Sequence, residues 1–232
     1  MKIAERGGHN YQATGASDII NEVTEDRAVS AAVKKYLGLG GASVIDCTPG
    51  NCDVNSDLAF GVNKANSEGA DIFCSFHFNS YKHTSYAMGS EVLVYNPFTE
   101  ANRVLNALVG LGFKNRGVKE RPGLYELRNT KMKAMIIETC FVDSEEDVRL
   151  YKQLGADTIG KAIAEAILGH AVEAPSTPSE PHTRPYEYGI VTASALNVRD
   201  SINGKILGTL PKGATVHIDY VKDGWASIFY GE

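Results

Sequence analysis

Apolar and polar positions divide the first 170 residues of the chain into two alternating kinds of segment. Short apolar runs bounded by turn residues are typical of buried strands, and longer segments with apolar residues at helical spacing are typical of amphipathic helices. The predicted strands cover residues 2–4, 42–46, 71–79, 91–95 and 134–138. The predicted helices cover residues 22–37, 55–67, 99–111, a short segment from 144, and 156–170. Strands that alternate with helices in this way predict a layered α/β domain.

Single residues set several of the predicted boundaries. Gly38 is expected to stop the first helix, Asn55 or Ser56 to cap the second, and Thr99 to cap the third. Two further segments, 115–118 and 124–128, are predicted to be short strands or loop arms around a Pro-Gly turn.

The pattern changes after residue 172. Residues 175–185 hold four prolines without apolar periodicity, which is typical of an extended linker. Beyond them the chain reads as short strands separated by turn residues, at 191–192, 196–199, 205–208, 215–218 and 225–228. The expected organisation is therefore a domain at 1–172, a Pro-rich linker at 173–186 and a small all-β domain at 187–232.

Composition and charge narrow the possible classes of protein. The chain has 43% hydrophobic and 22% charged residues, as ordinary soluble proteins do, and its net charge of -5 argues against a nucleic-acid-binding face. No apolar run reaches the ~18 residues of a membrane span, and residues 1–8 lack the apolar core of a secretory signal. We therefore expect synthesis in the cytoplasm without a signal peptide. The four cysteines lack C-x-x-C spacing, which favours free thiols.

Candidate chemistry lies at the ends of the predicted elements. The apolar strand 71–79 ends in His77 and Asn79, His9 follows the first strand, and Glu22 opens the first helix. Open α/β sheets place their sites at the carboxyl ends of strands. Two imidazoles and one carboxylate leave one open position on a tetrahedral zinc ion, which is the arrangement of a catalytic site. Spacing alone does not select these three residues, because a histidine at a strand end is more often a packed or hydrogen-bonded residue.

Glu138 is the fourth candidate. It ends the apolar run Met135-Ile136-Ile137, and its strand is a possible neighbour of the strand that carries His77. A carboxylate there would lie within one water of the metal, as a general base must. The alternative is a helix-capping or surface glutamate, which the apolar surroundings disfavour.

The order of these pieces along residues 1–170 resembles the amidase 3 family of zinc-dependent N-acetylmuramoyl-L-alanine amidases, which includes bacterial autolysins and phage endolysins. The resemblance rests on Gly8-His9, Glu22 at a helix start, Ser75-Phe76-His77-Phe78-Asn79, Gly89-Ser90-Glu91-Val92, Asn115-Arg116-Gly117-Val118-Lys119 and Ile137-Glu138-Thr139-Cys140-Phe141. It implies a twisted, mainly parallel sheet flanked by helices, Zn²⁺ held by His9, Glu22 and His77, and Glu138 as the catalytic acid/base. Two departures are visible. The family's usual Asp-Pro-Gly-His start is Arg6-Gly7-Gly8-His9 here, and Cys140 replaces the glycine of Glu-x-Gly-Phe.

The tail has a resemblance of its own. Leu196-Asn197-Val198-Arg199, the run from Gly208 to Gly213 and Asp223-Gly224-Trp225-Ala226 are similar to a bacterial SH3-type wall-binding domain. Such domains usually continue for one or two more strands, so we expect those strands to come from elsewhere or the domain to be truncated.

The resemblance predicts a peptidoglycan hydrolase that cuts the amide between N-acetylmuramic acid and L-alanine, with Asn79 and Arg116 contacting substrate. For Arg116 a surface ion pair is an equal alternative. The expected partner is the cell wall, reached after phage lysis or by export, and no nucleic acid or membrane span is expected. Two other functions remain open: a zinc peptidase that cuts within the stem peptide, and a non-catalytic wall-binding protein.

Overall fold

The computed structural model describes residues 1–173, 187–201, 204–222 and 225–228. It divides into two compact units, Met1–Pro175 and Ser176–Glu232. Of the predicted linker, residues 174–186 lie outside the described residues.

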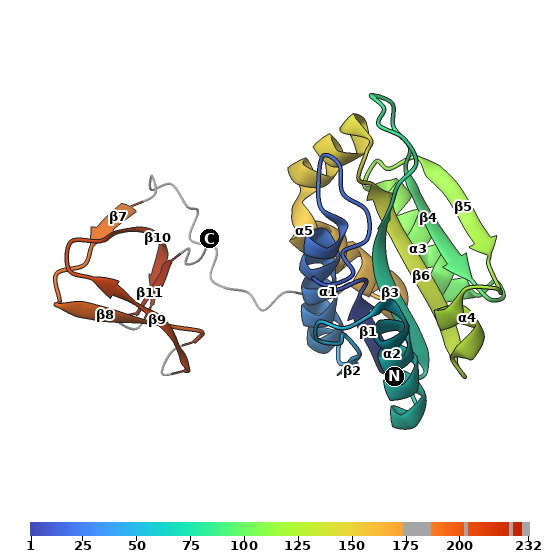
Figure 1. Cartoon of the computed structure of the whole chain (residues 1–232), viewed down its shortest axis with the longest axis horizontal. Coiled ribbons are helices and arrows are strands. Elements are labelled where there is room, and N and C mark those ends of the chain that lie inside the picture. The colour runs from blue at the N-terminus through green and yellow to red at the C-terminus, as the bar shows by residue number, and fades with distance from the viewer. Residues whose placement is uncertain (174–186, 202–203, 223–224, 229–232) are drawn as a thin grey trace. The chain divides into compact units, whose positions relative to one another are not determined.

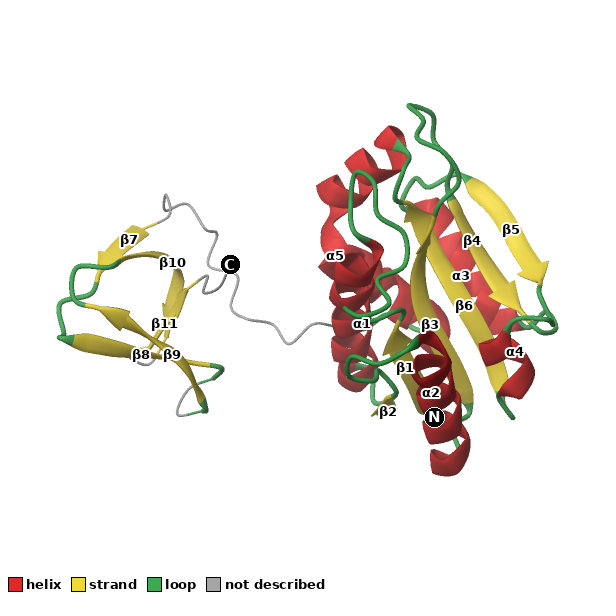
Figure 2. Cartoon of the chain, in the orientation of Figure 1, coloured by secondary structure: helices red, strands yellow, loops and turns green. Residues whose placement is uncertain are grey.

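The first unit is built on a six-stranded sheet with the strand order β2-β1-β3-β6-β4-β5 (Figure 2). Four neighbouring pairs are parallel, and only β4 and β6 run antiparallel. The prediction of a mainly parallel sheet flanked by helices is therefore confirmed. The strands are β1 (Lys2–Gly7), β2 (Ser43–Asp46), β3 (Ile72–Asn79), β4 (Ser90–Val94), β5 (Asn115–Glu120) and β6 (Lys133–Phe141).

Five helices cover the two faces of this sheet. They are α1 (Glu22–Leu39), α2 (Val54–Glu68), α3 (Thr99–Gly110), α4 (Tyr125–Asn129) and α5 (Glu145–Leu168). Helices α1, α3 and α5 cover one face of the sheet and form the larger apolar cluster with it. Helices α2 and α4 lie together over the other face, around a smaller cluster (Figure 1).

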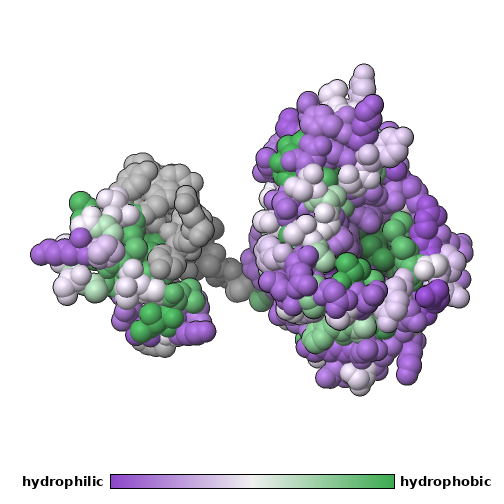
Figure 3. All heavy atoms as spheres, viewed as in Figure 1, coloured by the Kyte–Doolittle hydropathy of each residue, from purple (hydrophilic) through white to green (hydrophobic). Residues whose placement is uncertain are grey.

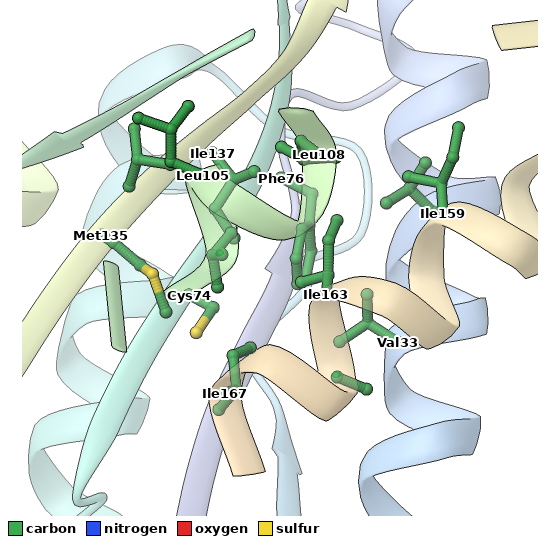
Figure 4. Close-up of a cluster of buried hydrophobic side chains, with 14 of the residues drawn as sticks. Val33, Cys74, Phe76, Leu105, Leu108, Met135, Ile137, Ile159, Ile163 and Ile167 are labelled. Atoms are coloured by element: carbon green, nitrogen blue, oxygen red, sulfur yellow. The ribbon is translucent and has the colours of Figure 1, made fainter. Parts of the chain in front are cut away.

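The larger cluster explains how the sequence pattern fixes the sheet. Successive strand residues point to opposite faces, so Cys74 and Phe76 of β3 and Met135 and Ile137 of β6 lie on the side of α5 (Figure 4). All four are fully buried. Burial of such side chains supplies the main driving force for the fold, roughly 25 cal/mol per Å² of apolar surface.

Several predicted boundaries were wrong, and local geometry gives the reasons. Helix α1 continues through Gly38 to Leu39, because Gly40 is the residue whose N–H bonds back to Tyr36 and Gly38. Asp53 caps α2 by accepting from the backbone N–H groups of residues 55 and 56, and α3 has no side-chain cap at all.

One further difference concerns a whole element. The predicted arm 124–128 is mostly helical, as α4. The two helices predicted after Ser144 are confirmed: α5 consists of two helical parts separated at Gly155, where φ is 75° and ψ is 154°. The cysteines are free thiols, as predicted.

The second unit contains only strands among its described residues. They are β7 (Glu187–Ile190), β8 (Ala195–Arg199), β9 (Ile206–Pro211), β10 (Thr215–Lys222) and β11 (Trp225–Ile228). Strands β7, β10 and β11 form one antiparallel sheet, and β8 and β9 form another. The strand predicted at 191–192 was wrong, since β7 ends at Ile190, just before it.

The surface of the first unit is mostly hydrophilic in the view of Figure 3, with hydrophobic residues gathered in smaller patches. Within the described part of the chain, no helix combines the length and the apolar character that crossing a bilayer requires.

Candidate metal centre

The three residues predicted as metal ligands meet at the carboxyl edge of the sheet. His9 follows β1, Glu22 is the first residue of α1, and His77 lies near the end of β3. The Oε1 atom of Glu22 is 3.2 Å from His9 Nε2 and 3.2 Å from His77 Nδ1. The two imidazole rings are 4.9 Å apart and nearly perpendicular, at 80°. One carboxylate oxygen thus lies between two ring nitrogens from separate elements.

Asp26 is a fourth member that the sequence reasoning missed. One donor atom from each of His9, Glu22, Asp26 and His77 lies within 4.8 Å of the others. Asp26 follows Glu22 by four residues, so both carboxylates lie on the same face of α1. That i, i+4 spacing within a predicted helix was the available signal.

The backbone around the ligands comes unusually close to their side chains. A Cβ atom on Gly8 would overlap the ring of His77, and one on Gly15 would overlap Glu22 and the ring of His9. His9 itself has a φ of 57°, in the left-handed region that few residues other than glycine adopt. The guanidinium of Arg27 donates to the carbonyl oxygen of His9 and, at 3.3 Å, to that of Gly7. These contacts hold the loop in a conformation that brings His9 to Glu22.

The charges of Glu22 and His77 stabilise one another. Burial alone would raise the pKa of Glu22, but the hydrogen bonds with His77 and His9 outweigh it and hold that pKa well below its usual range. Glu22 also accepts from the backbone N–H of Ala16 at 2.7 Å and of Phe78 at 3.2 Å. Burial lowers the pKa of His77, yet its hydrogen bond to Glu22 and nearby carboxylates raise it to about 9. The site therefore favours positive charge next to Glu22.

Unpartnered carboxylate atoms show that the residues fit a cation. Both side-chain oxygens of Asp26 and one of Glu138 are buried without a hydrogen-bond partner among the described residues. Leaving such groups unpaired is costly. Imidazole nitrogens together with carboxylate oxygens are the donors that zinc accepts, so the donor set fits that ion.

Glu138 lies on the strand next to His77, and the two residues pair in register across β3 and β6. Residues that pair in this way point to the same face of a sheet. Burial raises the pKa of Glu138 to about 7; the charge of His77 opposes the shift, and Glu22 and Glu91 add to it. A carboxyl group with a pKa near 7 can both take and return a proton at neutral pH.

Asn79 and Arg116, predicted to contact substrate, each have a polar partner within the fold. The side-chain oxygen of Asn79 accepts from the backbone N–H of Ser80 at 2.8 Å. Arg116 donates to Glu91 Oε2 at 2.7 Å, and its guanidinium lies 4.6 Å from the ring centre of Phe141. Glu91 pairs in register with Glu138 across β4 and β6. Arg116 therefore makes an ion pair, but with a buried carboxylate on β4, the strand next to that of Glu138, and not at the surface.

At Arg6 the sequence departs from the usual Asp-Pro-Gly-His start, and the structure shows how the charge of this residue is paired. Arg6 is 1% exposed, and its guanidinium contacts the carboxylates of Asp57 on α2 and Glu126 on α4. These residues were also missed, because no local spacing connects positions 6, 57 and 126. The buried charge at position 6 is paired by residues that only the tertiary fold brings to it.

A mainly parallel sheet that gathers imidazoles and carboxylates at its carboxyl edge defines an α/β protein with a candidate metal-dependent site. Residues 5–169 match the family described as N-acetylmuramoyl-L-alanine amidase (Amidase_3). The chain belongs to this family, as the sequence resemblance over residues 1–170 indicated.

Three proteins show what this chain is similar to. An uncharacterized protein of Clostridium perfringens (strain 13 / Type A) is 48% identical over 179 residues, which are 75% of this chain and 53% of that protein. The endolysin of Bacillus phage SPP1 is 29% identical over 71% of this chain and 61% of its own length. The solved catalytic domain of the CD27L endolysin, which targets Clostridia difficile, has a TM-score of 0.68 and 28% identity, and the match covers 75% of this chain and 99% of that domain.

The matched region is only part of the longer relatives. The match spans about half the length of two curated Clostridium perfringens proteins, 53% and 51%.

Proposed function

We propose that the protein is a zinc-dependent N-acetylmuramoyl-L-alanine amidase, which hydrolyses the amide between N-acetylmuramic acid and L-alanine in peptidoglycan. The observation that carries the proposal is the meeting of His9, Glu22 and His77 next to Glu138, which pairs in register with His77 and has one buried carboxylate oxygen. The family to which the chain belongs bears the name of this activity. A protein called an endolysin and the catalytic domain of another endolysin support the same substrate class.

In this proposal His9, Glu22 and His77 hold the zinc ion, and Asp26 lies close enough to balance its charge. When bound, zinc supplies Lewis acidity, which polarises a carbonyl group and makes a water more acidic. Glu22 keeps its place through two backbone N–H groups, so the donors are oriented before the ion arrives.

Glu138 moves the proton. Its carboxylate takes a proton from the attacking water and returns one to the nitrogen of L-alanine as the amide bond breaks. The side chain suits both steps, because burial brings its pKa to about 7 and one of its oxygens has no partner among the described residues.

Asn79 and Arg116 would contact the substrate. Arg116 and Lys119 share Glu91 Oε2, at 2.7 and 2.5 Å, and two cations on one carboxylate leave a net positive charge. That charge suits a carboxylate of the stem peptide. Asn79 would offer its amide once the contact with Ser80 is exchanged.

The organisation into domains and the role of the tail also belong to the proposal. We assign residues 1–172 to the catalytic domain, 173–186 to the linker and 187–232 to an SH3-like domain that binds the cell wall. The antiparallel strands β7 to β11 support a small β domain. The setting would be release of the enzyme from the cytoplasm during phage lysis, with export as the other route.

The test combines zinc analysis with loss of turbidity of purified Gram-positive walls, with and without a chelator. We expect zinc in the purified protein, clearing of the wall suspension, and loss of clearing in the chelator that added zinc restores. Clearing that survives complete removal of the metal would overturn the proposal, and so would a protein that binds zinc and leaves walls intact.

Mass spectrometry of the digested wall decides which bond is cut. An amidase releases a free lactyl carboxylate on N-acetylmuramic acid and a new N-terminal alanine. A zinc peptidase would instead leave the lactyl amide intact and expose a new terminus within the stem peptide. A non-catalytic wall-binding protein would produce neither product.

A further inference from the structure

A network of buried polar side chains begins at the ring nitrogen of His77 that faces away from Glu22. His77 Nε2 lies 3.0 Å from the hydroxyl of Ser75. That hydroxyl lies 3.4 Å from Glu126 Oε1, and the same oxygen lies 3.0 Å from Arg6 Nη1. Ser75 is fully buried, and Arg6 and Glu126 are 1% and 2% exposed. These side chains are thus shielded from water where they reach His77, the candidate metal ligand.

The direction of each hydrogen bond follows from the chemistry of the groups. A serine hydroxyl has one hydrogen to donate, and an ionised carboxylate can only accept. The permanent positive charge of Arg6 lies against Glu126, so the hydroxyl of Ser75 donates to Glu126. Its lone pairs then face His77 and accept a hydrogen from Nε2.

This arrangement determines the tautomer of the metal-binding, neutral ring of His77, in which the ion would replace the hydrogen that Nδ1 shares with Glu22 in the metal-free ring. A hydrogen on Nε2 leaves Nδ1 with its lone pair, and Nδ1 is the atom that faces Glu22 Oε1 at 3.2 Å. The hydrogen bond made by one ring nitrogen generally decides what the other can bind.

We infer that Glu126, acting through Ser75, is a positioning residue that fixes His77 as the Nε2–H tautomer and thereby presents Nδ1 to the metal. This inference rests on the proposed zinc site. Neither Glu126 nor Ser75 touches the other ligands or the substrate in this role.

Arg6 extends the same network to the loop that carries His9. Arg6 contacts Asp57, and the other carboxylate oxygen of Asp57 accepts from the amide of Asn10 at 3.0 Å. The amide oxygen of Asn10 in turn accepts from the backbone N–H groups of Gln12 and Ala13, at 2.9 and 3.2 Å. The guanidinium of Arg6 therefore connects the supports of two metal ligands.

The test uses the full chain and measures zinc affinity and the protonation of the His77 ring, not wall lysis. Zinc affinity comes from competition with a chelating indicator. The ring is observed by ¹⁵N NMR of the zinc-loaded, histidine-labelled protein, and the His77 signals are identified by their loss in His77→Gln. In the parent protein we expect a hydrogen on Nε2 and none on Nδ1.

Two variants interrupt the network in different ways. Ser75→Ala removes the acceptor for Nε2–H and should weaken zinc binding about 10–100-fold, as loss of an outer-shell partner usually does. Glu126→Gln keeps the size of the side chain but offers an amide that both donates and accepts. We expect it to weaken zinc binding about tenfold and to broaden or shift the Nε2–H signal.

Two control variants make comparable changes elsewhere. Ser30→Ala removes a buried hydroxyl that donates to Glu5, and Glu100→Gln removes the carboxylate of an ion pair with Lys133. Both should bind zinc like the parent. Unchanged affinity and an unchanged His77 spectrum in Ser75→Ala and Glu126→Gln would overturn the inference alone. A parent protein that binds no zinc would overturn the proposed function as well.

Discussion

The two faces of the six-stranded sheet are made from alternate residues of the same strands, yet they carry different kinds of side chain. On the face covered by α1, α3 and α5, β3 presents Cys74 and Phe76, and β6 presents Ile137, all in the larger apolar cluster. On the other face the intervening positions hold Ser75 and, near the strand end, His77. One strand thus serves both the core and the site.

The comparison teaches how the site is kept rigid. Glu91, Glu138 and His77 pair in register across β4, β6 and β3, which places them in a row on the face away from the large core. Each has a buried apolar neighbour in sequence: Val92, Ile137 and Phe76 are all fully buried. Packing on one face therefore fixes the positions of ionisable groups on the other.

The largest effect is expected from a change on the polar face alone, the removal of the proton-transferring carboxyl of Glu138. Glu138→Gln should lower the rate of amide hydrolysis roughly 10²–10⁴-fold, or about 3–5 kcal/mol of barrier, because the amide can neither take nor return the proton. Zinc content and the free energy of unfolding should not fall. The measurements are product formation by mass spectrometry, metal analysis and urea unfolding.

The matched control is the neighbouring residue on the opposite face. Ile137→Val trims one methylene from the large core and should leave the hydrolysis rate unchanged. Turnover by Glu138→Gln at the parent rate, with zinc bound, would show that Glu138 is not the acid/base.

The second prediction changes the apolar face instead of the polar face, so that stability falls and activity does not. Ile137→Ala should lower the free energy of unfolding by about 2–5 kcal/mol, because it leaves a cavity in a fully packed cluster. The rate of hydrolysis per folded molecule should stay near that of the parent. Urea unfolding gives the stability, and rates measured well below the transition give the activity. If activity falls as far as in Glu138→Gln, then the two faces are not separable.

The sequence pattern placed the candidate site residues at element ends, although spacing alone did not select them and the resemblance to a family did. His77 and Glu138 each follow an apolar run that reads as a strand, and β3 and β6 are indeed neighbours. His9 and Glu22 follow from the same logic at β1 and α1. Binary patterning determines these positions, because it decides where strands and helices begin and end.

The supporting groups could not be read in the same way. Arg6, Asp57 and Glu126 are far apart in sequence and meet only after α2 and α4 pack on the sheet. Glu126 also lies in a segment predicted as a strand or loop arm, whereas it belongs to the short helix α4. A five-residue helix shows too few turns for a 3.6-residue period to be recognised.

The third prediction concerns the one carboxyl group that β1 places in contact with α1. Glu5 is fully buried and accepts from the hydroxyl of Ser30 on α1. Burial raises its pKa to about 7, which the hydrogen bond from Ser30 partly opposes. A raised pKa means that the folded state holds the proton more tightly than the unfolded chain. The stability from this group is therefore full below about pH 4.5, and it is lost as the pH rises through about 7.

Glu5→Gln should remove that dependence. Relative to the parent, the variant should gain up to roughly 3 kcal/mol of unfolding free energy between pH 4.5 and pH 8. Urea unfolding at several pH values measures the difference. Glu120→Gln, a change at an exposed carboxylate, is the control and should follow the parent. A difference between Glu5→Gln and parent that does not change with pH would contradict the assignment.

The smallest expected effect tests whether the polar face of the sheet adds to the free energy of unfolding only when zinc is bound. Binding of zinc to the folded protein alone should add about 2.7 kcal/mol of unfolding free energy at a free zinc concentration 100 times Kd. His9→Ala should lose this increment, and in chelator it should differ from the parent only by loss of the contact with Glu22, because the side chain of His9 is 32% exposed and leaves no large cavity. The matched control is His83→Ala, since His83 is 54% exposed and pairs with Asp18 and Glu145 outside the group of donors. Thermal and urea unfolding with and without zinc measure both variants, and a full zinc increment in His9→Ala would place the ion elsewhere.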